Sequence, residues 1–391
     1  MSTKPRAIIV GAGIGGLATA WWLDKAGWTS IIIERAPTVL KGCYMMSLSG
    51  PCLETLKQMD LMEALDTISY EFDEKVIHDA RGRELRRLKY SDVHGGVESR
   101  TVIRGELASL LARSLPDSVE IRFIETLQEI VDDDDVDKVL VSLSTDEIIE
   151  ADLLIGADGI RSSVRSQFWK DEAVLENLGY RFAAYGIEDR HLGRRCALFN
   201  SPGHRDVLYG LRHNRLVALH IWRDGFGEQY HQAFKFDKFD LLRKATTGGP
   251  TRVGEVIKSA ERSNCPFTID DLTTVSLPQW SKGRILLLGD AAHCLTLLSG
   301  QGAGMALVSA EMLGKELMAT QDLTHALVNH EKKLRPMIER LQARSKKLAA
   351  TYIPKNVFIY YLRNFLVRIL PYAWVVKWYS HTAERNLLQE A

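Results

Sequence analysis

The chain has 391 residues, and its 50 lysines and arginines balance its 50 aspartates and glutamates, so the formal net charge is zero. This length predicts two or three domains, and the 46% hydrophobic and 26% charged fractions exclude a disordered or fibrous chain. The charge balance argues against nucleic-acid binding, which requires a basic excess. The cysteines lack the spacing of a zinc site or disulfide framework, so we expect no metal and a reducing compartment. They are Cys43, Cys52, Cys196, Cys265 and Cys294.

Two apolar segments raise the question of membrane targeting. Residues 7–23 resemble a secretory signal, but the glycines within them indicate a strand, a turn and a helix instead. Residues 356–380 are rich in aromatic side chains, yet two arginines and a proline interrupt them. No run therefore reaches the roughly 18–20 apolar residues that a membrane span needs. We expect a soluble, cytoplasmic chain, with peripheral membrane contact as the less favoured alternative.

The N-terminal segment predicts a strand–helix–strand unit. Ala7–Val10 is a short apolar run, typical of a parallel strand that is buried on both faces. Leu17–Ala26 contains helix formers and is followed by Gly27, a residue at which helices commonly end. Ser30–Glu34 is the second apolar run and completes the unit.

Apolar periodicity predicts the later elements. We expect helices over Cys52–Ile68 and Arg104–Ser114, and antiparallel strands over Val119–Phe123, Thr126–Val131 and Lys138–Leu143. The acidic run Asp132–Asp135 is most simply a solvated turn, with a metal site as the alternative. Residues 180–275 are rich in strand patterns, Arg284–Leu288 is a further buried strand, and from Ala303 onward the pattern is helical.

The first chemical motif is Gly11-Ala12-Gly13-Ile14-Gly15-Gly16, which matches G-x-G-x-x-G between a strand and a helix. Such glycines allow a tight turn and close approach to a pyrophosphate, which lies at the positive end of the helix dipole. Glu34 ends the next strand, where a carboxylate accepts hydrogen bonds from a ribose and repels a 2′-phosphate. The pattern therefore predicts a dinucleotide site for FAD or NAD rather than NADP.

A second motif, Gly289–His293, follows the strand Arg284–Leu288. Asp290 would therefore lie at the carboxyl end of a parallel strand, where ligands bind in open α/β sheets. Gly300–Gly304 then opens a helix over Met305–Leu317, whose N-terminus would favour a ring that gains negative charge on reduction. An ordinary strand–loop–helix connection with an aspartate cap is the alternative.

Two further signals are weaker alone. Gly156–Arg165 follows a buried strand at Asp152–Ile155, and its Asp158-Gly159 pair is also what a plain turn contains. Arg104 opens a helix after the strand-like Thr101–Ile103, and a single arginine is most often a surface residue.

These motifs, in this order, resemble the class A flavoprotein monooxygenases, the para-hydroxybenzoate hydroxylase family, over nearly the whole chain. Within that family the chain is most similar to bacterial polyketide and aromatic hydroxylases, including the tetracycline-inactivating monooxygenases. The resemblance implies FAD binding by Gly11, Gly13, Ile14, Gly15, Gly16, Glu34, Arg35, Arg104, Asp158, Asp290, Gly302 and Ala303. Glu34 would hold the adenosine ribose, Asp290 the ribityl chain or pyrophosphate, and Gly302-Ala303 the pyrimidine edge. One departure is the loop at 294–299, which lacks the prolines that many relatives carry.

The same resemblance implies an α/β fold with a Rossmann-like FAD-binding domain, an inserted, mainly antiparallel β-sheet substrate domain and a C-terminal helical segment. We expect the FAD-binding domain at 1–74, 98–176 and 271–350, the substrate domain at 75–97 and 177–270, and the C-terminal helical segment at 351–391.

The implied activity is monooxygenation. NADPH or NADH would reduce FAD transiently, and O2 would then form a flavin C4a-hydroperoxide. That species would hydroxylate, or insert oxygen into, an aromatic or polycyclic, polyketide-type small molecule, as in antibiotic biosynthesis or inactivation. The chemistry is carried by the cofactor, so no catalytic side chain is assigned. We expect a monomer or weak dimer.

Candidate substrate contacts come from the inserted sheet. Residues 206–224 look like a hairpin, and the substrate candidates are Tyr209, Arg212, His220, Trp222 and Leu297. Alternation along a strand puts His220 and Trp222 on one face. Ordinary packing is the alternative for each of these residues.

Other possibilities stay open at this point. The C-terminal segment could form a lid over the substrate, a peripheral membrane contact or plain core packing. A geranylgeranyl reductase-like enzyme without oxygen transfer is the main alternative activity. A flavin-dependent halogenase would need a W-x-W-x-I-P motif, which the tryptophans do not match. A non-enzymatic flavoprotein is the remaining alternative.

Overall fold

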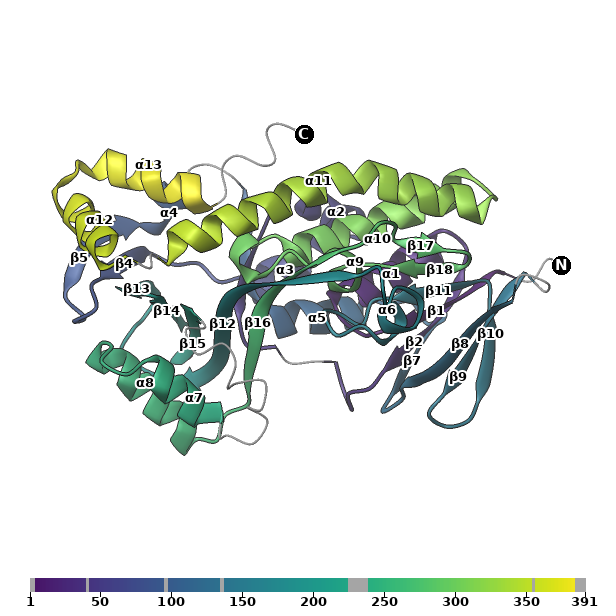
Figure 1. The fold of residues 1–391 in the computed structure, drawn as a ribbon, viewed down its shortest axis with the longest axis horizontal. Coiled ribbons are helices and arrows are strands. Elements are labelled where there is room, and N and C mark those ends of the chain that lie inside the picture. Colours follow the sequence, from purple (N-terminus) through teal and green to yellow (C-terminus); the bar gives the residue numbers. More distant parts are fainter. Residues whose placement is uncertain are drawn as a thin grey trace.

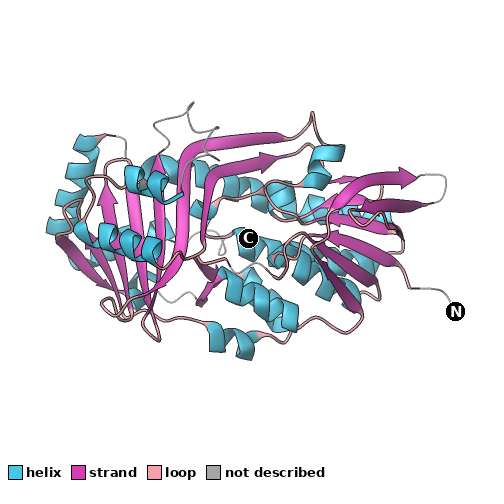
Figure 2. Cartoon of the chain, turned by 90° about the horizontal axis from the view of Figure 1, so that it is seen from below, coloured by secondary structure: helices cyan, strands magenta, loops and turns pink. Residues whose placement is uncertain are grey.

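The computed structural model describes residues 4–39, 42–94, 98–133, 137–223, 238–353 and 356–383. The strands gather into two groups at opposite ends of an elongated molecule, with helices around and between them (Figure 2). One group contains a six-stranded sheet and a three-stranded sheet, and the other is a seven-stranded sheet (Figure 1). This arrangement confirms the predicted α/β fold with an inserted, mainly antiparallel sheet.

The six-stranded sheet has the order β17-β18-β11-β1-β2-β7. Its strands are β1 (Arg6–Val10), β2 (Thr29–Glu34), β7 (Val119–Phe123), β11 (Leu153–Gly156), β17 (Ser281–Lys282) and β18 (Ile285–Leu287). All neighbours pair in parallel except β17 with β18. The predicted antiparallel pairing of Val119–Phe123 is therefore wrong, because β7 pairs in parallel with β2. Ile8, Ile9 and Leu154 are fully buried, as continuous apolar runs predict.

Helices lie around this sheet and around the short pair of strands β3 (Met45–Ser49) and β6 (Ser99–Ile103) (Figure 1). They are α1 (Ile14–Lys25), α2 (Pro51–Gln58), α3 (Met62–Ile68), α5 (Arg104–Arg113), α6 (Ser163–Phe168), α9 (Asp290–His293), α10 (Gly302–Ala319) and α11 (Leu323–Tyr352). Helix α1 packs closely on α10, where a Cβ on Gly314 would lie 2.9 Å from Cβ of Trp22. The single helix expected over Cys52–Ile68 is two helices, because Asp60 adopts a positive φ of 59° between them.

Two small sheets flank the six-stranded sheet. An antiparallel sheet contains β8 (Leu127–Asp133), β9 (Lys138–Leu143) and β10 (Ile148–Ala151). The strands β3 (Met45–Ser49) and β6 (Ser99–Ile103) form an antiparallel pair. The expected acidic turn at Asp132–Asp135 lies partly outside the described residues.

The seven-stranded sheet has the order β16-β12-β15-β14-β13-β4-β5. Its strands are β4 (Glu74–His78), β5 (Glu84–Lys89), β12 (Val174–Glu188), β13 (Arg195–Ser201), β14 (His204–Leu211), β15 (Arg215–Arg223) and β16 (Phe267–Ser276). The predicted hairpin is β14–β15. Arg212, His213 and Asn214 connect its paired strand ends, and the last two have positive φ. Strands β12 and β16 run together from this sheet toward the six-stranded sheet (Figure 1).

Residues 180–275 are not strands throughout. Helices α7 (Lys238–Ala245) and α8 (Thr251–Arg262) lie within them, and Phe239, Leu242 and Val256 pack with Tyr185 and Leu216 of the sheet. Two helices thus cover one face of the seven-stranded sheet, and the other face turns toward the rest of the chain (Figure 1). The domain boundaries given above stay a prediction.

The C-terminal segment forms α12 (Val357–Ile369) and α13 (Tyr372–Ala383), beside β5 and α4 (Tyr90–His94) (Figure 1). Val367 and Val375 pack against Ile77, Leu88 and Val93. In the described part of the chain, every helix is too short or too polar to cross a bilayer.

Candidate active site

A cavity of about 580 Å³ lies between the two large sheets. On one side it is lined by residues of the glycine motifs, among them Gly13, Ile14, Gly15, Arg35, Arg104, Asp158, Asp290, Gly302 and Ala303. On the other side it is lined by the seven-stranded sheet, through Phe182, Leu198, Val207, Tyr209, Leu219 and Ile221. The structure therefore brings motifs from four distant parts of the sequence together around one space.

The turn after β1 depends on glycine for two different reasons. Gly11 has φ +107°, and a Cβ there would lie 2.6 Å from the Ala157 carbonyl oxygen. A Cβ on Gly16 would overlap the carbonyl oxygen of Gly11. At Gly13 and Gly302, by contrast, the nearest protein atoms to a Cβ are 4.0 and 3.9 Å away. Both glycines line the cavity, so a side chain there would take space from a ligand rather than from the protein.

Two helices begin at the cavity with their first-turn N–H groups uncapped by described side chains. Helix α1 has 12 residues and α10 has 18, and neither has an acidic residue in its first turn. The uncapped N–H groups and the positive end of each dipole suit phosphate or another negatively charged group. This is the electrostatic environment that the sequence predicted for the pyrophosphate and the flavin ring.

The Glu34 carboxylate is buried at the end of β2. One oxygen accepts a hydrogen bond from the Ala12 N–H and the other from the Ala36 N–H, both at 2.8 Å. Glu34 thus fixes the glycine turn, and its contact with a ribose stays a prediction. The neighbouring Arg35 is exposed and lines the cavity.

Asp158 lies in the turn before helix α6 and lines the cavity. Its Oδ2 accepts hydrogen bonds from the Ser163 N–H at 2.6 Å and the Ser163 hydroxyl at 2.8 Å. Its Oδ1 is buried and has no hydrogen-bond partner among the described residues. The aspartate therefore stabilises the turn, as the plain-turn alternative predicted, and it also lines the cavity.

Arg165 joins the motif around Asp158 to the motif around Asp290. Its buried guanidinium donates to the Ala291 carbonyl at 2.8 Å and also to the Ile160 carbonyl. Burial lowers the pKa of Arg165, yet the two carbonyls satisfy a cation that would otherwise be costly to bury. The sequence analysis quoted this arginine within its motif and gave it no role.

Asp290 follows Gly289, whose φ of 64° and ψ of −140° are accessible essentially only to glycine. Protein surrounds the Asp290 carboxylate, but the side chain remains open to the cavity. Burial raises its pKa, and the positive charge of Arg104 opposes that rise. The Arg104 guanidinium lies 5.8 Å from the centroid of the Tyr44 ring.

The loop at 294–299 is strained where it borders the cavity. Thr296 has φ 61°, which is unusual for a β-branched residue, and its buried hydroxyl lacks a hydrogen-bond partner among the described residues. Helix α11 holds the loop, because Ser345 donates to the Leu295 carbonyl at 2.8 Å and Gln342 donates to the Cys294 carbonyl at 3.2 Å. Strain held in this way is common at functional sites.

Together these features fit FAD. The Gly13 and Gly302 positions leave ligand space, and two helix N-termini face it. Asp158 and Thr296 line the same space, and each has a buried oxygen without a hydrogen-bond partner among the described residues. The diphosphate, the ribityl hydroxyls and the flavin ring match these donors and acceptors in kind.

The substrate candidates divide between the two faces of the seven-stranded sheet. Tyr209 and Leu297 line the cavity, and their contact with substrate stays a prediction. Arg212 instead donates to the Thr67 carbonyl at 2.6 Å and lies over the Tyr70 ring.

His220 and Trp222 lie on the face that α7 and α8 cover, as the contacts of His220 with Asp206 and of Trp222 with the cluster around α7 and α8 show. The expectation that they line the cavity is corrected, because the alternate residues Leu219 and Ile221 do so. Alternation predicted that His220 and Trp222 share a face, but it could not tell which face is which.

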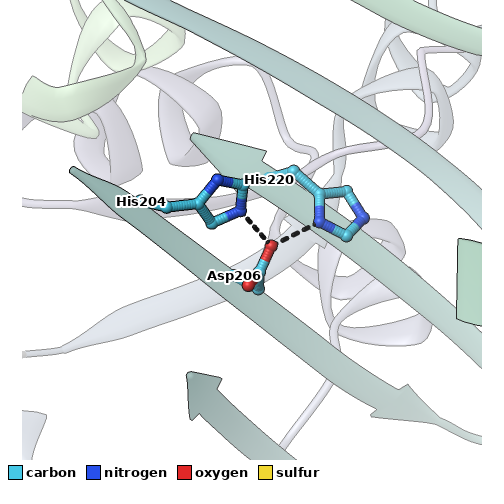
Figure 3. Close-up of side chains that lie close together, drawn as sticks. All are labelled: His204, Asp206 and His220. Atoms are coloured by element: carbon cyan, nitrogen blue, oxygen red, sulfur yellow. Dashed lines mark hydrogen bonds and ion pairs between the residues drawn. The ribbon is translucent and has the colours of Figure 1, made fainter. Parts of the chain in front are cut away.

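His220 belongs to a buried cluster that the sequence analysis missed (Figure 3). The Asp206 Oδ1 atom is 2.6 Å from His220 Nδ1 and 2.5 Å from His204 Nε2, and His220 Nε2 is 2.9 Å from the Tyr185 hydroxyl. Burial acts to raise the pKa of Asp206, but the two histidines outweigh it and hold that pKa below its usual value. The three groups could also hold a metal ion, but their direct hydrogen bonds to one carboxylate oxygen already account for the arrangement.

The placement of His220 in this buried cluster, away from the cavity, can be tested by substitution. His220→Ala would leave the Asp206 carboxylate buried with one partner fewer, so we expect the free energy of unfolding to fall by about 3 kcal/mol. FAD content should persist, since the cluster is on the face away from the cavity. Denaturant unfolding and the flavin spectrum measure both quantities. Unchanged stability with weakened binding of aromatic ligands would contradict this assignment.

A second prediction concerns the space at Gly13. Gly13→Ala should fold, because its Cβ meets no protein atom closer than 4.0 Å, but we expect FAD affinity to fall about tenfold or more. Titration of the apoprotein by flavin fluorescence measures this. Gly254→Ala is the matched control, since a Cβ on Gly254 of α8 also meets nothing within 4 Å and is remote from the cavity. Equal affinities of the two variants would show that Gly13 does not face the cofactor.

Comparison with known proteins agrees with this site. Residues 4–326 match the family model described as FAD binding domain. A flavin-dependent monooxygenase of Legionella longbeachae is 26% identical over 91% of this chain and 92% of its own length. The 6-hydroxynicotinate 3-monooxygenase of Bordetella bronchiseptica is 28% identical over 83% of this chain and 86% of its own length. The crystal structure of tetracycline destructase Tet(55) superimposes with a TM-score of 0.81 at 24% identity, covering 98% of this chain and 99% of that one.

The chain belongs to the FAD binding domain family, and its fold is that of the class A flavoprotein monooxygenases, as the motifs predicted. The protein is a FAD-dependent monooxygenase, an oxidoreductase. FAD is its cofactor, and NADPH or NADH is the reductant typical of the family.

Proposed function

We propose that the protein hydroxylates, or inserts oxygen into, an aromatic or polycyclic, polyketide-type small molecule, with NADPH or NADH and O2 as co-substrates. The observation that carries the proposal is the continuity of one cavity from the glycine motifs, to which we assign FAD, to an apolar sheet surface. Such a lining with few polar groups is typical of sites for aromatic ligands. The Bordetella relative is named for oxidation of a nicotinate ring and the Tet(55) neighbour for tetracycline, which favours the same class.

Bound FAD supplies the redox and oxygen-transfer chemistry. The protein's own contribution is to bind, orient and exclude water. The N-terminus of α10 favours negative charge near Gly302 and Ala303. The apolar sheet residues and the strained loop around Thr296 and Leu297 enclose the space that the substrate would occupy.

The charges on the sheet side of the cavity suggest what the substrate carries. Asp270 and Asp271 are each in an ion pair, with Arg161 and Arg181 respectively, both at 2.7 Å. Lys75 of β4 lines the same side, and its Nζ lies 5.8 Å from the centroid of the Tyr90 ring. No carboxylate among the described residues pairs with Lys75. The sheet side therefore keeps a positive charge in an apolar setting, and we propose that it receives an anionic oxygen of the substrate, such as a carboxylate or an ionised phenol.

Oxygen transfer is tested by following NADPH and NADH oxidation under air with a panel of phenolic and polycyclic compounds. We expect at least one compound to stimulate oxidation and to gain one oxygen atom from isotopically labelled O2, detected by mass spectrometry. Flavin reduction that no aromatic compound stimulates would contradict the substrate class. Electron transfer to a substrate only in the absence of O2 would contradict oxygen transfer itself.

The role of Lys75 is tested by ligand binding, without turnover. A charge-assisted hydrogen bond contributes about 1.5–3 kcal/mol. We therefore expect Lys75→Met to lower the affinity for a hydroxynaphthoate by about tenfold or more. The neutral hydroxynaphthamide should bind both proteins alike. Perturbation of the flavin absorbance measures each affinity, and Lys258→Met, at an exposed lysine of α8, is the control. If Lys75→Met lowered the affinities for the acid and the amide equally, Lys75 would contribute through packing and not through its charge.

A further inference from the structure

Helix α12 is apolar on nearly all sides but buries only a narrow stripe. Tyr360, Asn364 and Val367 face the protein, at the spacing of one helix face. The Tyr360 hydroxyl accepts a hydrogen bond from the Ala80 N–H at 2.8 Å and donates one to the Asn200 carbonyl at 3.1 Å. Leu366 is half-buried, and the other large apolar side chains of the helix are exposed, namely Val357, Phe358, Ile359, Tyr361, Leu362, Phe365 and Ile369.

Helix α13 continues the same surface. Val375 is buried against β5 and α4, and the Tyr372 hydroxyl accepts from the Lys89 N–H at 2.9 Å and donates to Asp92 at 2.8 Å. Trp374 and Trp378 nevertheless remain exposed, and Trp374 has 67% of its surface open to solvent, compared with 72% for Phe358 of α12. Soluble monomers rarely expose so many large apolar side chains together, and such patches mark sites of interaction.

The charge on these two helices has one sign. Between Asn356 and Ser380 the charged residues are Arg363, Arg368 and Lys377, without a single aspartate or glutamate. The chain on either side adds to this bias, because residues 340–383 also lack acidic side chains. The basic residues of that longer range are Arg340, Arg344, Lys346, Lys347, Lys355, Arg363, Arg368 and Lys377.

We propose that the outer faces of α12 and α13 dock on the surface of an anionic phospholipid bilayer. Aromatic side chains with apolar bodies suit the boundary between headgroups and acyl chains, and basic residues are attracted to anionic lipids. The chain lies on the bilayer without crossing it, since neither helix is long enough to span one. Of the three alternatives that the sequence left open for the C-terminal segment, this proposal selects the peripheral membrane contact.

A second copy of the chain fits this surface less well. In a two-fold dimer the same patch meets itself, so its basic side would meet the basic side of the other copy. Neither helix carries an acidic residue between Asn356 and Ser380, and juxtaposed like charges disfavour such an interface. An anionic bilayer carries negative charge over its surface and accepts apolar side chains at the same time.

The test is sedimentation of the flavin-containing, full-length protein with vesicles. One vesicle type is phosphatidylcholine alone, and the other is phosphatidylcholine and phosphatidylglycerol in equal parts. We expect binding to the anionic vesicles that is weakened by added salt, because salt screens the charges. The double variant Phe358→Ser, Trp374→Ser should reduce that binding by about tenfold or more, since apolar contact area is lost.

Ile148→Ser is the matched control, because Ile148 is an exposed apolar residue on β10, far from α12 and α13. Retained flavin absorbance and an unchanged melting temperature show that each variant folds. Absence of vesicle binding by the unaltered protein, or equal binding to both vesicle types, would overturn the proposal. A dimer that the double variant converts to monomer, without vesicle binding, would overturn it in favour of a second copy.

Discussion

The flavin site depends on a backbone-to-backbone contact between two turns, one after β1 and one after β11. Val10 and Gly156 are partners in the parallel register, so the two turns leave the sheet side by side. Gly11 then lies so close to the Ala157 carbonyl that only a residue without a side chain fits, and a Cβ on Gly156 would lie 2.7 Å from Leu287 of the next strand. Three sequence motifs thereby share one edge of the sheet, and the helix N-termini and Asp290 meet around the same space.

Those parts of the site that obey local rules could be predicted from the sequence. Glycines between an apolar strand and a helix, and an aspartate at the end of a parallel strand, have positions that follow from the geometry of a parallel sheet. The antiparallel domain could be predicted less completely from the sequence. Alternation grouped His220 with Trp222, but which group faces the cavity depends on where α7 and α8 pack, and the sequence analysis did not detect those helices. The same limit explains the wrong prediction for β7. Its parallel pairing with β2 depends on contacts between residues far apart in the sequence.

Rigidity in this site comes from outside the cofactor motifs. The Arg165 guanidinium bridges the turn after β11 and the first residues of α9, and α11 holds the loop in which Thr296 adopts an unfavourable φ. A buried cation between carbonyls is costly to form but geometrically specific, because displacement of either partner leaves charge unsatisfied. The loop is therefore held by contacts with α11, although residues 294–299 contain no proline. Its Leu297 and Leu298 also pack against the core of the seven-stranded sheet.

The C-terminal helices also protect a sheet edge. Strand β5 is the last strand of the seven-stranded sheet, and an unprotected edge strand is a template for pairing with another chain. Here the Lys89 N–H is bonded to the Tyr372 hydroxyl, the Arg86 guanidinium donates to the Leu370 carbonyl at 3.0 Å, and Val367 covers Leu88. A chain shortened before Asn356 would keep every cofactor motif but lose this cover. Its first failure would then be self-association through β5 during folding or storage, and a low yield of such a fragment would reflect aggregation rather than a damaged flavin site.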